Sequence, residues 1–263
     1  MSYPLPASAR TLQAKMRAFV DESLIPWEVH AEMNNGEIPP EVRAEHVAKA
    51  RELGIDNMAV PKDLGGGGLS MIEQVVVQEQ MGRVTNALSW CTGNVQPWML
   101  KACSPYQIET WVKPNIAGRR HECYAITEPG AGSDVDAIEA TARRDGDSYV
   151  LNGEKWHVTS ANLADHFIFQ AKIADGPHAG SHSLFFVDKD TPGVELVRTP
   201  AYSHTYAAHH PIYRFRDVRV PVANRIGEEG AGMEFTYEWF RYERLMIAAR
   251  CCGAAERLID EAT

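Results

Sequence analysis

The sequence predicts an α+β protein in which a helical N-terminal domain is followed by a strand-rich middle domain and then by one long helix. Three observations predict this class. Apolar residues recur at three- and four-residue spacing up to about Tyr106, alternate with polar residues beyond about Arg120, and return to the helical spacing after residue 230. We therefore expect three domains, spanning residues 1–119, 120–229 and 230–263.

Composition limits the classes of protein that this chain can represent. Of 263 residues, 44% are hydrophobic, which is enough for a large core, and 35 acidic against 26 basic residues give a net charge of −9. No cluster of lysine and arginine resembles a nucleic-acid footprint, so we do not expect nucleic acid as a partner. Neither a signal-peptide core nor an apolar run of membrane-spanning length is present, which predicts a soluble, cytoplasmic protein without a membrane partner.

The first domain contains at least three amphipathic helices. Helical spacing of apolar residues is clearest over residues 12–24, 42–55 and 70–84. Gly54 is expected to end the second of these helices, and Ser70 is expected to cap the N-terminus of the third. A turn-rich, four-glycine segment separates them.

Seven short runs with alternating or β-rich patterns predict the strands of the middle domain. They cover residues 122–127, 148–151, 155–160, 166–173, 183–188, 193–197 and 212–220. Between the second and third runs stands Asn152-Gly153, the dipeptide that favours a two-residue type I′ turn. We therefore expect a hairpin with its turn at this dipeptide.

The C-terminal segment predicts one helix of about thirty residues, because the apolar spacing is helical and Gly253 is its only weak helix former. Two apolar stripes run along it, formed by Phe240, Ile247, Cys251, Ala254 and Leu258, and by Leu245, Ala248, Cys252, Ala255 and Ile259. Such a helix needs partners on two sides. Since the pattern continues to the last residue, we expect that part of the native protein is missing or that another chain covers the stripes.

Cysteines and histidines give no sign of a metal site. The five cysteines lack paired spacing and are expected to be buried, reduced thiols. His209 and His210 are adjacent, and His121-Glu122-Cys123 lacks the second cysteine motif of a zinc deaminase. No nucleophile elbow of a hydrolase is present either.

Two glycine-rich loops could expose backbone N–H groups to a phosphate. Residues 65–68 and 130–132 form these loops, but neither continues into a P-loop signature, and the second lacks the third glycine of a dinucleotide fingerprint. On these templates alone each loop is equally compatible with a turn.

The order of the motifs is more informative than any one of them. The segment YAITEPGAGSDV at residues 124–135 is followed by KWHVTS, RFRDVRVP, IGEEGAGM and then ERLMIA at residues 243–248. This series resembles the acyl-CoA dehydrogenase family over nearly the whole chain. The resemblance implies an N-terminal helical domain, a middle domain like a β-barrel or sandwich, and a C-terminal four-helix bundle around FAD, of which residues 230–263 would be the first helix. A homo-oligomer, dimer or tetramer, is implied as well.

The resemblance assigns the flavin site to two segments of the middle domain. The expected FAD contacts are Tyr124, Ile126, Thr127, Gly132, Ser133, His157, Val158 and Thr159, and Ser133 would also approach the CoA thioester. His157 occupies a position where family members usually carry an aromatic ring, and Trp156, its neighbour on a strand, would face the other way. Core packing of Tyr124 and Ile126, or a surface position for His157, are the alternatives.

The resemblance also implies a carboxylate base. Glu243 directly precedes Arg244 in the first helix of the C-terminal domain, which matches the minority of the family that carries its catalytic glutamate there. Arg244 would orient this base or the CoA side of the site, and Arg241 would contact the substrate head group. The alternative is that Glu243 only pairs with a charge such as Arg250.

The resulting functional hypothesis is an FAD-dependent acyl-CoA dehydrogenase. It would remove a proton from the carbon next to the thioester, transfer hydride from the following carbon to flavin, and pass electrons to an electron-transfer flavoprotein. The alternatives are a flavin oxidase or monooxygenase of the same fold, or a non-catalytic fragment or subunit that binds acyl-CoA or FAD. The acyl chain stays open: His204, His209 and His210 could approach a polar acyl group or lie on the surface.

Overall fold

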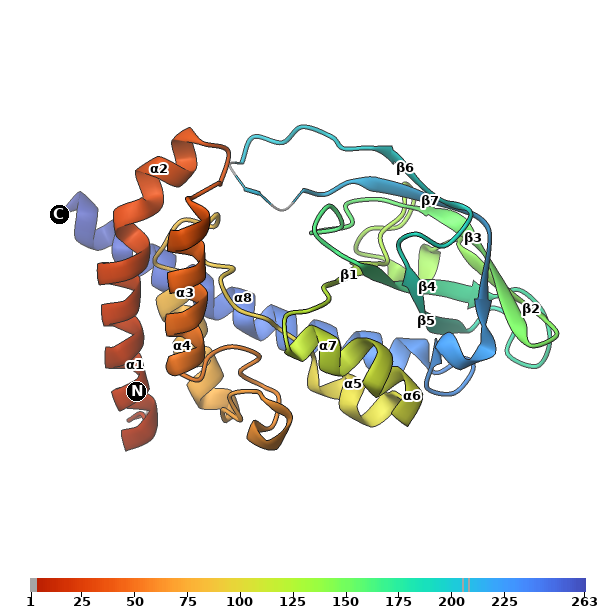
Figure 1. Ribbon diagram of the computed structural model, residues 1–263, viewed down its shortest axis with the longest axis horizontal. Helices are drawn as coiled ribbons and strands as arrows, with labels where there is room; N and C mark the ends of the chain where they lie inside the picture. The colour runs from red at the N-terminus through yellow and green to blue at the C-terminus, as the bar shows by residue number, and fades with distance from the viewer. Residues whose placement is uncertain (1–3, 205, 208) are drawn as a thin grey trace. The chain divides into compact units, whose positions relative to one another are not determined.

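A computed structural model describes residues 4–204, 206–207 and 209–263 of the chain (Figure 1). The chain divides into two compact units. One, the helical unit, contains the described residues between Met1 and Pro97, between Ser203 and Ala207, and between Trp239 and Thr263. The other, the sheet unit, contains Trp98–Tyr202 and the described residues between Ala208 and Glu238. The predicted α+β class is confirmed, while the three domain boundaries stay a prediction.

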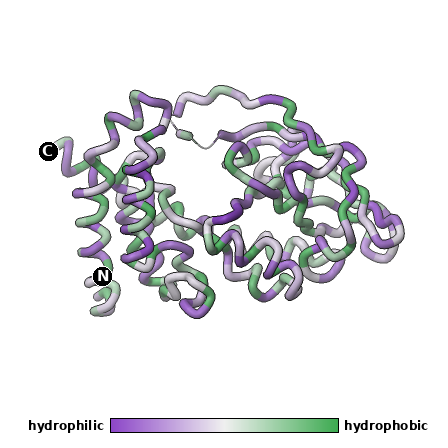
Figure 2. Tube along the Cα trace, in the orientation of Figure 1, coloured by the Kyte–Doolittle hydropathy of each residue, from purple (hydrophilic) through white to green (hydrophobic). Residues whose placement is uncertain are grey.

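The helical unit is built around a core shared by its helices. Its helices are α1 (Ala7–Phe19), α2 (Glu28–Met33), α3 (Pro40–Glu52), α4 (Met71–Met81) and the later part of α8 (Gly232–Ala262). A π-helical turn (Val20–Leu24) and a 3-10 turn (Ile25–Trp27) join α1 to α2. Figure 2 shows hydrophobic and hydrophilic residues interspersed along α1 and α3, and the buried residues of α3, Val42, His46 and Ala50, recur at four-residue spacing on one face.

Local capping fixes the ends of these helices as the sequence predicts. Ser70 caps α4 in a capping box, because its hydroxyl accepts from the Glu73 N–H and the Glu73 carboxylate accepts from the Ser70 N–H. Helix α3 ends at Glu52, and Gly54 follows with a φ of +71°, which is a conformation that glycine adopts at low cost. Both predictions are confirmed.

Two glycines allow α4 and α8 to cross at backbone contact. A Cβ on Gly253 would lie 1.7 Å from the Glu79 carbonyl oxygen, and one on Gly82 would lie 2.1 Å from the Arg250 carbonyl oxygen. The weak helix former Gly253 is therefore required by packing. The crossing also fixes the position of Arg250 beside the end of α4.

The sheet unit contains one mixed, eight-stranded sheet. Its strands are β1 (Glu122–Ala125), β2 (Thr141–Asp145), β3 (Ser148–Lys155), β4 (His166–Ile173), β5 (His182–Asp188), β6 (Val194–Arg198), β7 (Ile212–Pro221) and β8 (Arg225–Ile226). The strand order is β6-β7-β3-β2-β4-β5-β8, with β1 pairing in parallel to β4. Short helices α5 (Pro97–Ala102), α6 (Pro105–Gln107) and α7 (Lys113–Ile116) precede the sheet, with a π-helical turn (Ile108–Val112) between the last two.

This sheet curves strongly around its own core. Strand β7 is three positions from β4 in the strand order, which corresponds to about 14 Å across a flat sheet. The ring centroids of Phe169 and Phe215, on β4 and β7, are nevertheless 4.4 Å apart, and those of Phe167 and Tyr213 are 4.9 Å apart. The curvature agrees with the barrel-like or sandwich-like form that the sequence analysis expects.

The predicted hairpin turn at Asn152-Gly153 is wrong. Strand β3 runs through this dipeptide, and the two-residue loop is Gly146-Asp147, between β2 and β3, where Gly146 has a φ of +62°. The pairing of β3 with β7 shifts register between Leu151 and Gly153. A Cβ on Gly153 would lie 2.6 Å from the Cβ of Ala140, so this glycine serves a bulge and a close approach.

The long C-terminal helix is confirmed, since α8 extends over 31 residues. The face that it buries in the helical unit is formed by Tyr242, Met246, Ala249 and Gly253. Both predicted apolar stripes flank this face, and in the described chain Leu245, Ile247, Leu258 and Ile259 are 42%, 54%, 67% and 63% exposed.

All five cysteines are free thiols. Cys103 and Cys123 are buried and Cys91 is half-buried, whereas Cys251 and Cys252 are exposed on α8. The prediction of buried thiols is therefore wrong for the last two. They share the exposed apolar stripes of the helix.

Candidate functional site

The loop at residues 128–134 begins as a tight turn directly after β1. Glu128 and Ala131 exchange two backbone hydrogen bonds of 3.0 and 3.1 Å around Pro129-Gly130. The turn leads into residues 132–134, whose side chains and backbone are exposed. The loop therefore presents its second glycine and Ser133 outward from a fixed base.

A buried ion pair anchors this loop to β3. The Lys155 ammonium donates to a Glu128 carboxylate oxygen at 2.6 Å and to the Ile126 carbonyl at 3.0 Å, and the two side chains are only 0% and 6% exposed. Glu128 also accepts the backbone N–H groups of Glu139 and Ala140 at 2.6 and 3.0 Å. Burial lowers the pKa of Lys155 to about 8, and the Glu128 carboxylate opposes this shift.

Sequence reasoning did not identify this pair as part of the site. In the sequence Glu128 follows one predicted strand and Lys155 opens another, and no local pattern links the two residues. The pair joins the two segments that carry the predicted flavin contacts, and a backbone bond of 2.8 Å from the Trp156 N–H to the Thr127 carbonyl reinforces the junction.

The protein groups that are predicted to contact the flavin around this loop differ in whether they already form hydrogen bonds within the protein. The Ile126 and Thr127 carbonyl oxygens are engaged by Lys155 and Trp156, as described above. In the part of the chain that the structure describes, the hydroxyls of Thr127 and Ser133 make no hydrogen bond. Gly132 has no protein atom within 4 Å of the position of a Cβ, and its φ is not positive, so neither packing nor backbone conformation explains the glycine.

The Tyr124 side chain points into a polar network beneath the sheet. Its hydroxyl is 3.1 Å from the Thr236 hydroxyl and 3.4 Å from Gln170 Oε1, and Gln170 Nε2 lies 2.9 Å from His182 Nδ1. Burial raises the pKa of Tyr124 and lowers that of His182. The bonded hydroxyl favours a packing role for this side chain, which was the alternative that the sequence left open.

His157, Val158 and Thr159 do not form a strand. Strand β3 ends at Lys155, and His157 and Ser160 follow with left-handed φ values of +51° and +66°. The alternation used to orient Trp156 and His157 therefore does not apply, which corrects that argument. Val158 is buried in the core of the sheet unit.

The two polar side chains of this segment face the chain before β7. His157 is exposed, with Nδ1 2.7 Å from the Tyr202 hydroxyl, and the Thr159 hydroxyl lies 2.9 Å from His210 Nδ1. Strained left-handed residues other than glycine persist where surrounding structure holds them, and they cluster at functional sites. The hydrogen bond between His210 and Thr159 also shows that one of the three loop histidines contacts a predicted site residue.

Glu243, Arg241 and Arg244 lie on α8 in the helical unit. Glu243 is half-buried, its carboxylate accepts from Trp239 Nε1 at 3.2 Å, and burial raises its pKa. Arg241 and Arg244 are exposed, and the Arg244 guanidinium lies 5.5 Å from the Phe240 ring centre. A raised carboxyl pKa suits a base that acts near neutral pH.

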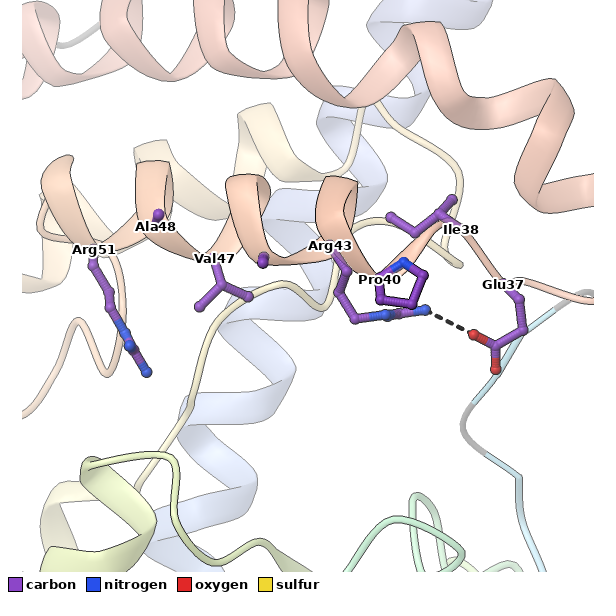
Figure 3. Close-up of a pocket in the computed structure, with 8 residues that line it drawn as sticks. Glu37, Ile38, Pro40, Arg43, Val47, Ala48 and Arg51 are labelled. Carbon is purple, nitrogen blue, oxygen red and sulfur yellow. Dashed lines mark hydrogen bonds and ion pairs between the residues drawn. The ribbon is translucent and has the colours of Figure 1, made fainter.

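A shallow groove on α3 contains none of the predicted site residues (Figure 3). It has a volume of about 460 Å³ and is lined by Glu37, Ile38, Pro40, Arg43, Ala44, Val47, Ala48 and Arg51. The charges at its rim are already satisfied, since Arg43 pairs with Glu37 at 2.9 Å and Arg51 with Asp56 at 3.0 Å.

The described residues show neither a metal site nor a membrane span. No group of three or more histidine, cysteine, aspartate or glutamate side chains is arranged to hold a metal ion among them. Nor does any described helix have the length and hydrophobicity needed to cross a membrane.

Comparisons with known proteins agree on one family. Residues 6–119 match the acyl-CoA dehydrogenase N-terminal domain, and residues 123–218 match the acyl-CoA dehydrogenase middle domain. The caffeyl-CoA reductase-Etf complex subunit CarC of Acetobacterium woodii is 30% identical over 94% of this chain and 65% of its own length. The chain thus spans less than two thirds of that relative.

Solved structures give the same result. A probable acyl-CoA dehydrogenase from Mycobacterium abscessus superposes with a TM-score of 0.83 at 31% identity, covering 98% of this chain and 68% of the other. An acyl-CoA dehydrogenase from Bacillus anthracis, solved in complex with FAD, superposes with a TM-score of 0.78 at 25% identity, covering 96% of this chain and 43% of the other.

Proposed function

The chain belongs to the acyl-CoA dehydrogenase family, and on that premise we propose that it binds FAD and oxidises an acyl-CoA thioester between its α and β carbons. The observation that carries the proposal is the junction of residues 124–134 with residues 155–159 through the buried Glu128–Lys155 pair. This junction holds two candidate flavin-binding segments in fixed register without using the Thr127 and Ser133 hydroxyls.

The residues of the sheet unit fit a flavin. Thr127 and Ser133 offer hydroxyl donors, and Gly132 lets a ligand approach the backbone because no side chain stands there. Ile126 and Thr159 complete the proposed contacts, whereas we assign the Tyr124 hydroxyl to the polar network. When bound, FAD would supply the hydride acceptor.

The proposed base is Glu243. Its carboxylate would accept the proton from the carbon next to the thioester, and its half-buried position raises its pKa toward the working pH. Trp239 holds the carboxylate by its indole N–H, so it would orient the base. We propose Arg241 and Arg244, exposed on the same helix, as contacts for the CoA part of the substrate.

The electron acceptor is proposed to be an electron-transfer flavoprotein. The name of the Acetobacterium woodii relative includes such a complex, which supports this partner. Reoxidation of the reduced protein by air at catalytic rates would instead favour the oxidase or monooxygenase alternative.

Flavin binding and flavin reduction test the proposal separately. We expect the purified protein to bind FAD with the visible absorption of a flavoprotein, and Thr127→Ala and Ser133→Ala to weaken FAD affinity without loss of folding. We expect a saturated acyl-CoA to bleach the bound flavin anaerobically, and Glu243→Gln to abolish the bleaching while FAD binding persists. Bleaching at an unchanged rate in Glu243→Gln would assign the base to another residue.

A further inference from the structure

Arg250 lies in a polar and aromatic cluster of the helical unit. Its guanidinium donates to Gln78 Oε1 at 2.9 Å, to the Ser89 carbonyl at 3.4 Å and to the Ser89 hydroxyl, and it lies 4.3 Å from the Trp90 ring centre. These contacts use at most three of the five N–H donors of the guanidinium. The cluster is therefore built to hold an arginine head group in one place with donors to spare.

What the cluster lacks is a counter-charge. The six other arginines of the described chain that are buried or half-buried each have a carboxylate within 4 Å: Arg17, Arg83, Arg120, Arg214, Arg225 and Arg257. Arg250 is half-buried, and no described carboxylate lies within ion-pair distance of it. Since a shielded charge is normally paired, an anion is the missing partner.

The position of Arg250 on α8 connects it to the proposed base. Glu243 and Arg250 are seven residues apart, so they lie on one face of the helix, about 10.5 Å apart along its axis. Their charges influence each other without forming an ion pair. Beside Arg250, Trp90 is 47% exposed and its ring centre is 6.5 Å from that of Tyr206, which provides aromatic surface for a methylene chain.

We propose that Arg250, supported by Ser89 and Trp90, binds a carboxylate at the far end of the acyl group, so that the preferred substrates are CoA thioesters of dicarboxylic acids. This inference rests on the proposed function, in which Glu243 acts at the carbon next to the thioester. The guanidinium keeps N–H donors that the protein does not use, so it can donate a charge-assisted hydrogen bond to a carboxylate oxygen, and burial strengthens that interaction relative to water. A thioester with a methyl group at the same end would leave the charge unpaired.

Matched pairs of thioesters test this substrate class. The FAD-loaded protein would be titrated calorimetrically with glutaryl-CoA against valeryl-CoA, adipyl-CoA against hexanoyl-CoA, and suberyl-CoA against octanoyl-CoA. We expect roughly tenfold or tighter binding of the dicarboxylic member in at least one pair, because only that member neutralises the guanidinium. Equal or weaker binding of the dicarboxylic member in all three pairs would overturn the inference.

Variants identify the residue responsible. Arg250→Met should remove the preference, Arg250→Lys should retain part of it, and the control Arg43→Gln, on the outer surface of α3, should leave it unchanged. Preserved selectivity in a folded Arg250→Met protein would assign the anion to another group. If this variant does not fold, the comparison of the three pairs on the unaltered protein still decides.

The two proposals fail in different ways. If hexanoyl-CoA bleaches the flavin and no dicarboxylic thioester binds more tightly, the dehydrogenase function stands and the Arg250 inference is wrong. If the dicarboxylic thioesters bind more tightly but none of the six thioesters bleaches the flavin, the anion site stands and the proposed function is wrong.

Discussion

Lys155 in the sheet unit and Arg250 in the helical unit are both shielded cations, yet the protein treats them differently. Lys155 is fully buried and bonded to the Glu128 carboxylate at 2.6 Å, and Glu128 in turn accepts two backbone N–H groups. Among the described residues, neutral oxygens and an aromatic ring hold Arg250, and no carboxylate pairs with it. We infer from this difference that a buried cation paired with a carboxylate of the protein stabilises the fold, whereas a shielded cation without such a partner is suited to bind an anionic ligand.

Breaking the Glu128–Lys155 ion pair should have the largest effect on stability. Lys155→Met leaves the Glu128 carboxylate buried with only backbone donors, and we expect a loss of about 3–5 kcal/mol in the free energy of unfolding. Urea unfolding followed by circular dichroism measures this loss. A loss below about 1 kcal/mol would show that the pair is not a structural anchor and would remove the first half of the comparison.

His166 extends the comparison to a shielded group that stays neutral. It is fully buried, no described group forms a hydrogen bond with either ring nitrogen, and burial lowers its pKa to about 4 from an ordinary value of 6.5. The unfolded chain therefore takes up a proton as pH falls through 6.5 while the folded protein does not. Stability contributed by the neutral ring is present above pH 6.5 and is lost as pH falls toward 4, by up to about 3 kcal/mol.

Replacing this histidine should remove that pH dependence. His166→Phe keeps an aromatic ring beside Phe186 and carries no titratable nitrogen, so its stability should decrease less than that of the unaltered protein between pH 6.5 and 4. Thermal unfolding at a series of pH values measures the difference. Parallel pH profiles for the two proteins would indicate that His166 is not the titrating group.

Replacing Arg250, which has no carboxylate partner, should reduce the free energy of unfolding less than breaking the Glu128–Lys155 pair. Arg250→Met loses hydrogen bonds to Gln78 and Ser89 but leaves no carboxylate unpaired, so we expect a loss of about 1–2 kcal/mol. The same urea experiment measures it, beside Lys155→Met. A loss as large as that of Lys155→Met would mark Arg250 as a structural residue and contradict the distinction between the two sites.

Replacing Arg43, an exposed arginine in an ion pair, should have the smallest effect on the free energy of unfolding. Arg43 is 45% exposed in its ion pair with Glu37, and Arg43→Gln should change the free energy of unfolding by less than about 0.5 kcal/mol. Its unfolding curve serves as the reference for the variants at Lys155, His166 and Arg250. A clear loss would mean that the groove of Figure 3 contributes more to the fold than its exposure indicates.

Local signals in the sequence predicted local structure well. The periodicity of α8, the Ser70 cap and the helix end at Gly54 all depend on neighbours within a few residues, and the structure confirms each one. Asn152-Gly153 has an equally clear local signal, but it was misread, because the bulge against β7 and the contact with Ala140 come from residues far away in the sequence.

The buried charges could not have been predicted from local patterns. Glu128 and Lys155 are 27 residues apart, and only the fold brings them together. The left-handed conformation of His157 likewise depends on bonds to distant segments, such as the one from the Val158 N–H to the Pro211 carbonyl. Family resemblance proposed the segments of the site, whereas the atoms that hold these segments together could be identified only in the structure.

The reduction of bound flavin by substrate tests the central claim most directly. The FAD-loaded protein would be mixed anaerobically with adipyl-CoA and with hexanoyl-CoA, and the visible flavin band would be followed in the unaltered protein and in Glu243→Gln. We predict loss of the band in the unaltered protein, faster at low concentration with adipyl-CoA, and no loss in Glu243→Gln with FAD still bound. An unchanged flavin band with both thioesters, in a folded protein that retains FAD, would contradict the proposed function.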